Sequence, residues 1–116
     1  MRSEAQYLID MVEAADAVAR FLDGIERDAF LQDELRQSAV IQKIGVIGEA
    51  AGKISPELRG RYPDVSWSKI VGMRNLLVHG YFSIKETIVW TTATQSVPQL
   101  RTRISKILVQ EFGIKL

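Results

Sequence analysis

The 116-residue sequence contains no cysteine and a single histidine, His79. Without cysteine, the chain can form neither a disulfide framework nor a thiolate metal site, which suits a reducing compartment. A single histidine also argues against a zinc or di-iron centre, because metal sites in helix bundles combine several carboxylates and imidazoles. The sequence therefore predicts a protein that uses no metal and no cofactor.

Long apolar runs and the familiar catalytic signatures are missing as well. No segment approaches the roughly 20 consecutive apolar residues that cross a bilayer, and residues 1–4 lack the apolar core of a signal peptide. The sequence has no phosphate-binding glycine loop, no dinucleotide-binding turn and no nucleophile elbow. We therefore expect one domain, residues 1–116, in the cytoplasm and without a membrane partner.

Charge is distributed unevenly along the chain, although the net charge is only +1. Residues 1–35 carry nine acidic and three basic side chains, a balance of −6, whereas residues 36–116 carry twelve basic and five acidic, a balance of +7. A basic surface would attract phosphates. A solvated charged surface is an equally good interpretation, because two parts of a sequence need not form two faces.

The apolar residues recur with a helical period, and no strand alternation interrupts them. This pattern predicts an all-α bundle of four or five helices. Ser3 and Gln6 form a capping box before the first helix, and the charged connector after it should be held to the core by Phe30 and Leu31. The first two expected helices span about residues 3–23 and 33–54, and the third runs from an N-cap at Ser66 to Gly80. The last begins at a second capping box at 83–86 and continues almost to the end of the sequence. Because of Pro98, we expect a kink or a break into two helices near 95–97.

The second expected helix contains three glycines, Gly45, Gly48 and Gly52. Each glycine destabilises a helix interior by up to about 1 kcal/mol relative to alanine, so this strip of small residues is expected to have a structural role. Such a strip lets another helix approach closely, either within the chain, which we favour, or across a dimer contact. Glu49 lies in this strip and is a candidate ion-pair partner for Arg74.

The third expected helix has apolar residues around most of its circumference and should be largely buried. Arg74 falls inside the apolar arc, where a guanidinium without partners would be very costly. Either Arg74 is paired inside the fold, or the arc is a cleft or a subunit interface. Asn75 and His79 lie four residues apart on one edge, where the amide could orient the imidazole.

The polar residues of this stretch, Arg74, Asn75, His79 and Tyr81, are sufficient for metal-independent RNA cleavage. Histidine exchanges protons near neutral pH, and arginine binds a phosphate with two N–H groups. The reaction benefits from two proton-transfer groups, which a two-fold dimer would provide from one histidine per chain. On chemistry alone, the alternative is that His79 caps a helix C-terminus and Arg74 is a structural ion-pair partner.

Residues 74–81 also have the Arg-x4-His-x-Tyr pattern of HepT-like proteins, in the HEPN superfamily of helical ribonucleases and toxins. Other parts of the sequence resemble this family too, and together they cover about residues 1–110. They are residues 47–51, Tyr62-Pro63, Trp67, residues 70–75, residues 88–90 and Pro98.

The resemblance implies a HEPN-type bundle that forms a two-fold homodimer with a composite RNA-cleaving cleft. It also implies a toxin–antitoxin pair with an MNT-type nucleotidyltransferase. By this resemblance Arg74 and His79 are the catalytic pair, Asn75 is the polar residue that supports them, and Tyr81 is the tyrosine that the partner modifies with AMP. Two rival interpretations are a non-catalytic helical module that docks a nucleotidyltransferase and an RNA-binding protein without cleavage.

Overall fold

The computed structural model describes residues 2–79 and 84–116. Every regular element in these ranges is helical, which confirms the prediction of an all-α, HEPN-type bundle. None of the helices in the described ranges is both long and apolar enough to cross a membrane. The elements are α1 (Glu4–Leu22), α2 (Arg27–Leu31), α3 (Glu34–Ala51), α4 (Pro56–Arg61), α5 (Trp67–His79), α6 (Glu86–Thr91), the π-helical turn η2 (Thr92–Ser96) and α7 (Val97–Phe112).

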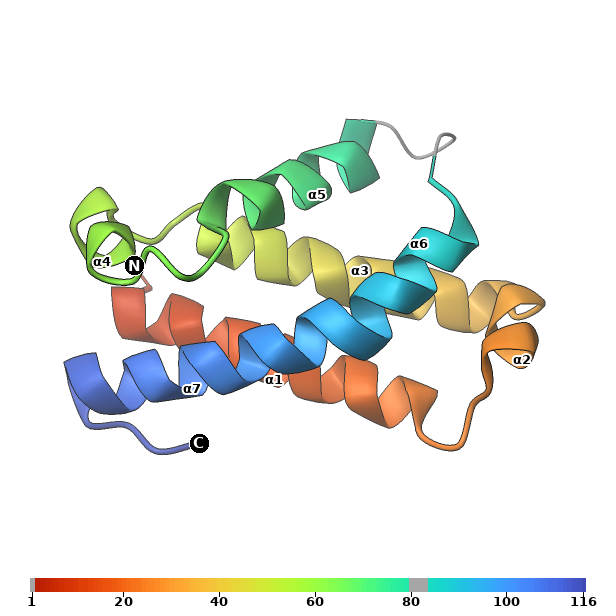
Figure 1. Cartoon of the computed structure of the whole chain (residues 1–116), viewed down its shortest axis with the longest axis horizontal. Helices are drawn as coiled ribbons and strands as arrows, with labels where there is room; N and C mark the ends of the chain where they lie inside the picture. Colours follow the sequence, from red (N-terminus) through yellow and green to blue (C-terminus); the bar gives the residue numbers. More distant parts are fainter. Residues whose placement is uncertain (1, 80–83) are drawn as a thin grey trace.

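Four long helices, α1, α3, α5 and α7, make up most of the bundle (Figure 1). Helix α1 packs against both α3 and α7, whereas α5 lies along α3 on the outer side. Helix α1 is therefore central and α5 peripheral. The largest fully buried side chains come from α1, α2, α3, α4 and α7 and include Leu8, Met11, Phe30, Val40, Leu58, Ile104, Ile107 and Leu108.

The helix starts follow the capping residues for α1 but not for α6. Ser3 is the N-cap of α1: its hydroxyl accepts a hydrogen bond from the Gln6 amide at 3.2 Å, and the Gln6 side chain accepts one from the Ser3 amide at 2.7 Å. This confirms the first capping box. Helix α6 begins at Glu86 with Lys85 as its N-cap, later than the second capping box predicted, whose Ser83 lies outside the described residues.

The last helical segment is irregular next to Pro98, where the sequence predicts a kink or a break into two helices. Instead of two separate helices, the backbone passes through the π-helical turn η2 and continues directly into α7. Pro98 lacks the N–H that the carbonyl of Thr94 would receive in an α-helix. The wider hydrogen-bond spacing of a π-turn accommodates this loss without ending the helix.

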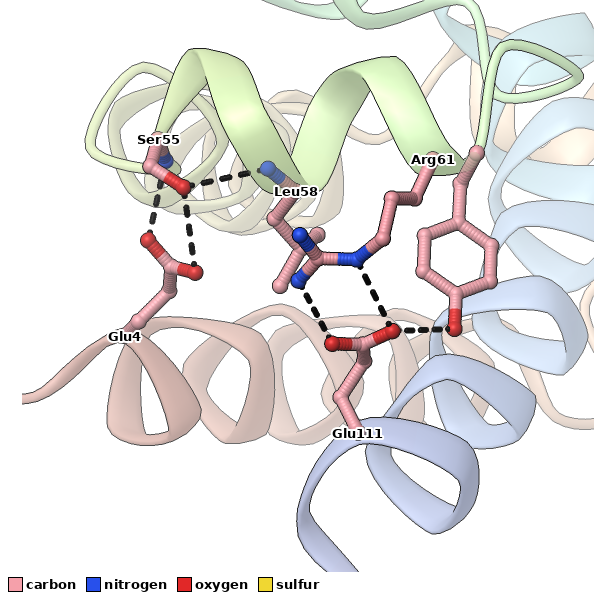
Figure 2. A network of polar contacts seen from close by, with 6 residues as sticks. Glu4, Ser55, Leu58, Arg61 and Glu111 are labelled. Carbon is pink, nitrogen blue, oxygen red and sulfur yellow. Dashed lines mark hydrogen bonds and ion pairs between the residues drawn. The ribbon is translucent and has the colours of Figure 1, made fainter.

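Helix α4 is fixed to α7 by a carboxylate that accepts from two neighbouring residues (Figure 2). The Arg61 guanidinium lies 2.6 Å from one oxygen of Glu111 and 3.2 Å from the other, and the Tyr62 hydroxyl donates to Glu111 at 2.7 Å. The hydrogen bond from Arg61 is the largest cause that lowers the pKa of Glu111, and the hydrogen bond from Tyr62 is the second. The hydrogen bond to Glu111 in turn raises the pKa of Tyr62. The carboxylate thus stays ionised and keeps α4 against α7.

At the same end of the bundle, hydrogen bonds hold α4 against α1 and fix the residue at which α5 starts. Glu4 accepts hydrogen bonds from the amide and the hydroxyl of Ser55, at 2.9 and 3.3 Å (Figure 2). Beyond α4, the carbonyl of Tyr62 accepts a hydrogen bond from the indole of Trp67 at 3.1 Å. Trp67 is the first residue of α5 and is buried. The polar contacts around α4 therefore anchor the N-terminal end of the helix that carries Arg74.

Candidate functional site

Helix α5 is covered on one side only, because its main packing partner is α3. Trp67 and Leu77 are buried, but Met73 is half-buried and Leu76 is 45% exposed. The prediction that this helix is largely buried is therefore wrong for the single chain. The apolar surface of α5 extends around most of its circumference, and a single neighbouring helix can cover only one side of it.

The closest approach of α5 to α3 is at Gly48. A Cβ atom built on Gly48 would lie 2.2 Å from the Cβ and 3.0 Å from the Cγ of Arg74. Carbon atoms in contact normally lie about 3.5–4.0 Å apart, so glycine is required here. By contrast, a Cβ on Gly45 would meet no described atom within 4 Å apart from its chain neighbours and the backbone of α3 itself. Within the glycine strip, Gly48 therefore serves packing within the chain, which is the interpretation that we favoured from the sequence.

The guanidinium of Arg74 is held by two neighbours. Its Nη2 lies 2.9 Å from Oε2 of Glu49 on α3, and its Nη1 donates to Oδ1 of Asn75 at 3.2 Å. The ion pair shows that Glu49, a candidate from the sequence, is a partner of Arg74. The Arg74 side chain remains 32% exposed. A guanidinium has five N–H donors, and the contacts with described residues use two of them.

His79 is the last residue of α5, which places it at the helix C-terminus as predicted. It follows Arg74 by five residues, or about 7.5 Å along the helix axis. The side chain of His79 and the whole of Tyr81 lie outside the described residues, and so does the expected contact between Asn75 and the imidazole. The structure thus brings together Arg74, Asn75 and Glu49, and it fixes the backbone position of His79.

A separate groove of about 370 Å³ lies between α5 and the η2–α7 segment. Arg74 is not among the residues that line it. In the part of the chain that the structure describes, no three histidine, cysteine or acidic side chains cluster in a way that could hold a metal ion. The lining of the groove includes Ile44, Ile47, Lys69, Ile70, Met73, Leu100 and Arg103.

Comparison with known proteins decides the family. The family model described as Ribonuclease HepT-like matches residues 11–107. The chain belongs to the HepT-like ribonuclease family. This confirms the resemblance inferred from the motif at residues 74–81. No solved structure gives a significant match to the chain.

Relatives of the chain carry ribonuclease names. "Probable ribonuclease HepT" of Thermococcus cleftensis is 32% identical over 91% of this chain and 96% of its own length. "Putative RNase MJ1380" of Methanocaldococcus jannaschii is 32% identical over 89% of this chain and 94% of its own length. The similarity therefore extends over nearly the whole of each protein. The roles of Arg74, Asn75, His79 and Tyr81 remain predictions.

Proposed function

We propose that the protein is a metal-independent endoribonuclease in which Arg74 and His79 act on the RNA phosphate. The observation that carries this proposal is the arrangement of Arg74, which is oriented by Glu49 and Asn75 yet one-third exposed, five residues before the histidine at the helix end. Membership of the HepT-like ribonuclease family and the ribonuclease names of the relatives support it.

The proposed reaction is an internal transfer of the phosphate. A histidine takes the proton of the 2′-hydroxyl, and the resulting oxygen attacks the phosphorus. The bond from phosphorus to the 5′-oxygen then breaks, and an acid returns a proton to that leaving oxygen. The guanidinium of Arg74 stabilises the charge that accumulates on the phosphate oxygens in the transition state. The products are a 2′,3′-cyclic phosphate and a free 5′-hydroxyl, and no water is consumed.

The proposed active form is a two-fold homodimer. Each chain carries one histidine, whereas the reaction uses a base and an acid, and two copies of α5 at one cleft would provide both. The exposed apolar side chains of Leu76 on α5 and Ile88 on α6, at 45% and 49%, support an interface in this region. The two helices flank residues 80–83 in the sequence.

Size-exclusion chromatography with light scattering, followed by an RNA-cleavage assay of the fractions in EDTA, tests this function. We expect a dimer at micromolar concentration and cleavage in the same fractions, with 2′,3′-cyclic phosphate ends. A monomer, intact RNA or a requirement for magnesium would refute the proposal.

A second candidate function is a non-catalytic helical module that docks a nucleotidyltransferase. The ion pair between Arg74 and Glu49 favours this function, because a structural arginine would be paired in this way. The cleavage assay separates the two functions, since only the ribonuclease would cut RNA.

We further propose that an MNT-type nucleotidyltransferase is the antitoxin of this protein and silences it by transferring AMP to Tyr81. In this step the tyrosine oxygen attacks the α-phosphate of ATP, and pyrophosphate leaves. Tyr81 follows the end of α5 by two residues. The added nucleotide would bring a negative charge close to the C-terminal end of α5, where it could occupy the phosphate site of Arg74 and exclude RNA.

Tyr81→Phe is expected to keep most of the cleavage activity while escaping control by the partner. Mass spectrometry after incubation with the nucleotidyltransferase and ATP should show one AMP on the wild-type protein and none on this variant. Tyr7→Phe on α1 is the matched control and should be modified normally. AMP on another residue, or undiminished cleavage by the modified protein, would contradict the regulatory role.

A further inference from the structure

Glu49 contacts the arginine that we propose as catalytic, but it comes from a different helix and from far away in the sequence. Its carboxylate lies 2.9 Å from Nη2 of Arg74, and its side chain is 54% exposed. We propose that Glu49 is a positioning residue, which orients the Arg74 guanidinium toward the RNA phosphate without touching the phosphate itself. This inference rests on the function proposed above.

The contacts of Arg74 fix its side chain at three points. The first carbons of the side chain lie against Gly48, where the helices are so close that even a methyl group would not fit. Asn75, on the same helix, binds Nη1, and Glu49, on α3, binds Nη2. Because the two terminal nitrogens are held from two directions, the plane of the guanidinium is defined before any substrate arrives.

Such preorganisation matters because a planar guanidinium recognises a phosphate through parallel N–H bonds. Among the described residues, only Glu49 and Asn75 take N–H groups of Arg74, which leaves three of its five donors for this purpose in that part of the chain. Without Glu49, only the adjacent amide of Asn75 would hold the guanidinium among the described side chains. The group would then sample orientations in which it does not face the developing charge.

The negative charge of Glu49 also affects RNA binding, in the direction opposite to its effect on turnover. A carboxylate beside the guanidinium repels a phosphate that binds there. Its removal should therefore reduce turnover while leaving RNA binding unchanged or tighter. A purely structural ion pair would behave differently, because an exposed pair contributes little to stability and its loss would leave kcat unchanged.

The test is steady-state cleavage of a short RNA by wild-type protein and by Glu49→Gln, Glu49→Asp and Glu13→Gln, all in EDTA. Glu49→Gln should lower kcat about tenfold without raising KM. Glu49→Asp keeps the charge on a shorter side chain and should recover part of the lost kcat. Glu13 is an exposed glutamate on α1, so Glu13→Gln removes the same charge elsewhere and should match the wild type.

A double-mutant cycle shows whether Glu49 acts through Arg74. Arg74→Lys keeps a positive charge but loses the planar donor group. In that background Glu49→Gln should have no further effect on kcat, because its target is gone. An unchanged kcat in the single variant, a raised KM, or an undiminished effect in the Arg74→Lys background would overturn the inference.

An NMR measurement tests the positioning role of Glu49 independently of the proposed ribonuclease activity. The Nε–H resonance of Arg74 can be identified by its loss in Arg74→Lys, and it should shift in Glu49→Gln but not in Glu13→Gln. If the wild type cleaves no RNA, the ribonuclease function fails, while a shifted resonance still supports Glu49 as the residue that orients Arg74. An unshifted resonance would overturn the positioning role irrespective of activity.

Discussion

Replacing either His79 or Arg74 by alanine is expected to reduce the rate of RNA cleavage by about a hundredfold or more. His79→Ala removes the group that transfers protons to and from the ribose and the leaving oxygen. Arg74→Ala removes the cation that stabilises the phosphate in the transition state. The measurement is single-turnover cleavage of a labelled RNA at saturating protein, which reports the chemical step and not the affinity for RNA.

Both variants should remain folded, so that lost activity can be assigned to lost chemistry. Alanine at position 74 keeps the Cβ that lies against Gly48. The carboxylate of Glu49 is half-exposed and can be solvated when its partner is removed. Arg27→Ala removes an exposed arginine far from α5 in the sequence and should cleave like the wild type. Full cleavage by a dimer of His79→Ala would refute the mechanism.

The fold could be predicted from the sequence where local signals and the apolar period agree. The capping box of Ser3 and Gln6 marks the start of α1, and Asp33 caps α3 close to the predicted boundary. Phe30 is fully buried as expected, but its connector forms the short helix α2, which five residues are too few to reveal by periodicity. The sequence signals therefore placed the long helices and missed the short helix α2.

The exposure of α5 could not be predicted, because it depends on where the helix lies in the bundle. Apolar residues around a helix show that it packs against other elements, but they do not show how many such elements the single chain provides. In the single chain α5 is peripheral, so Leu76 is exposed although its residue type suggested a core position. The same pattern fits a helix that becomes covered in a dimer.

The candidate site could be predicted in part. The cost of an unpaired guanidinium and the position of Glu49 among the glycines made Glu49 a candidate partner of Arg74, and the structure shows that the two are paired. The choice of Gly48 as the contact point required the structure, since Gly45 and Gly52 belong to the same strip and only the helix crossing distinguishes them. Asn75 accepts a hydrogen bond from Arg74 through its amide oxygen, and the expected contact between its amide and His79 lies outside the described residues and stays a prediction.

Gly48→Ala is expected to destabilise the protein by about 1–3 kcal/mol and to reduce RNA cleavage about a hundredfold. Its new methyl group would lie 2.2 Å from the Cβ of Arg74 and 3.1 Å from the carbonyl oxygen of Ile70, so both the side chain and the backbone of α5 would have to move. Thermal unfolding should show a Tm lower by about 4 °C for each kcal/mol lost.

Gly45→Ala is the matched control, because it makes the same chemical change on the same helix where, apart from neighbouring residues and the backbone of α3, no described atom lies within 4 Å of the new methyl group. It should raise the stability by up to about 1 kcal/mol, since alanine favours the helix more than glycine does, and it should leave cleavage unchanged. The pair of variants thus separates helix propensity from helix contact. If Gly48→Ala cleaves RNA at the wild-type rate, the position of Arg74 against α3 does not determine activity. If it is inactive at a temperature at which it is fully folded, the close approach at Gly48 is what places the guanidinium for catalysis.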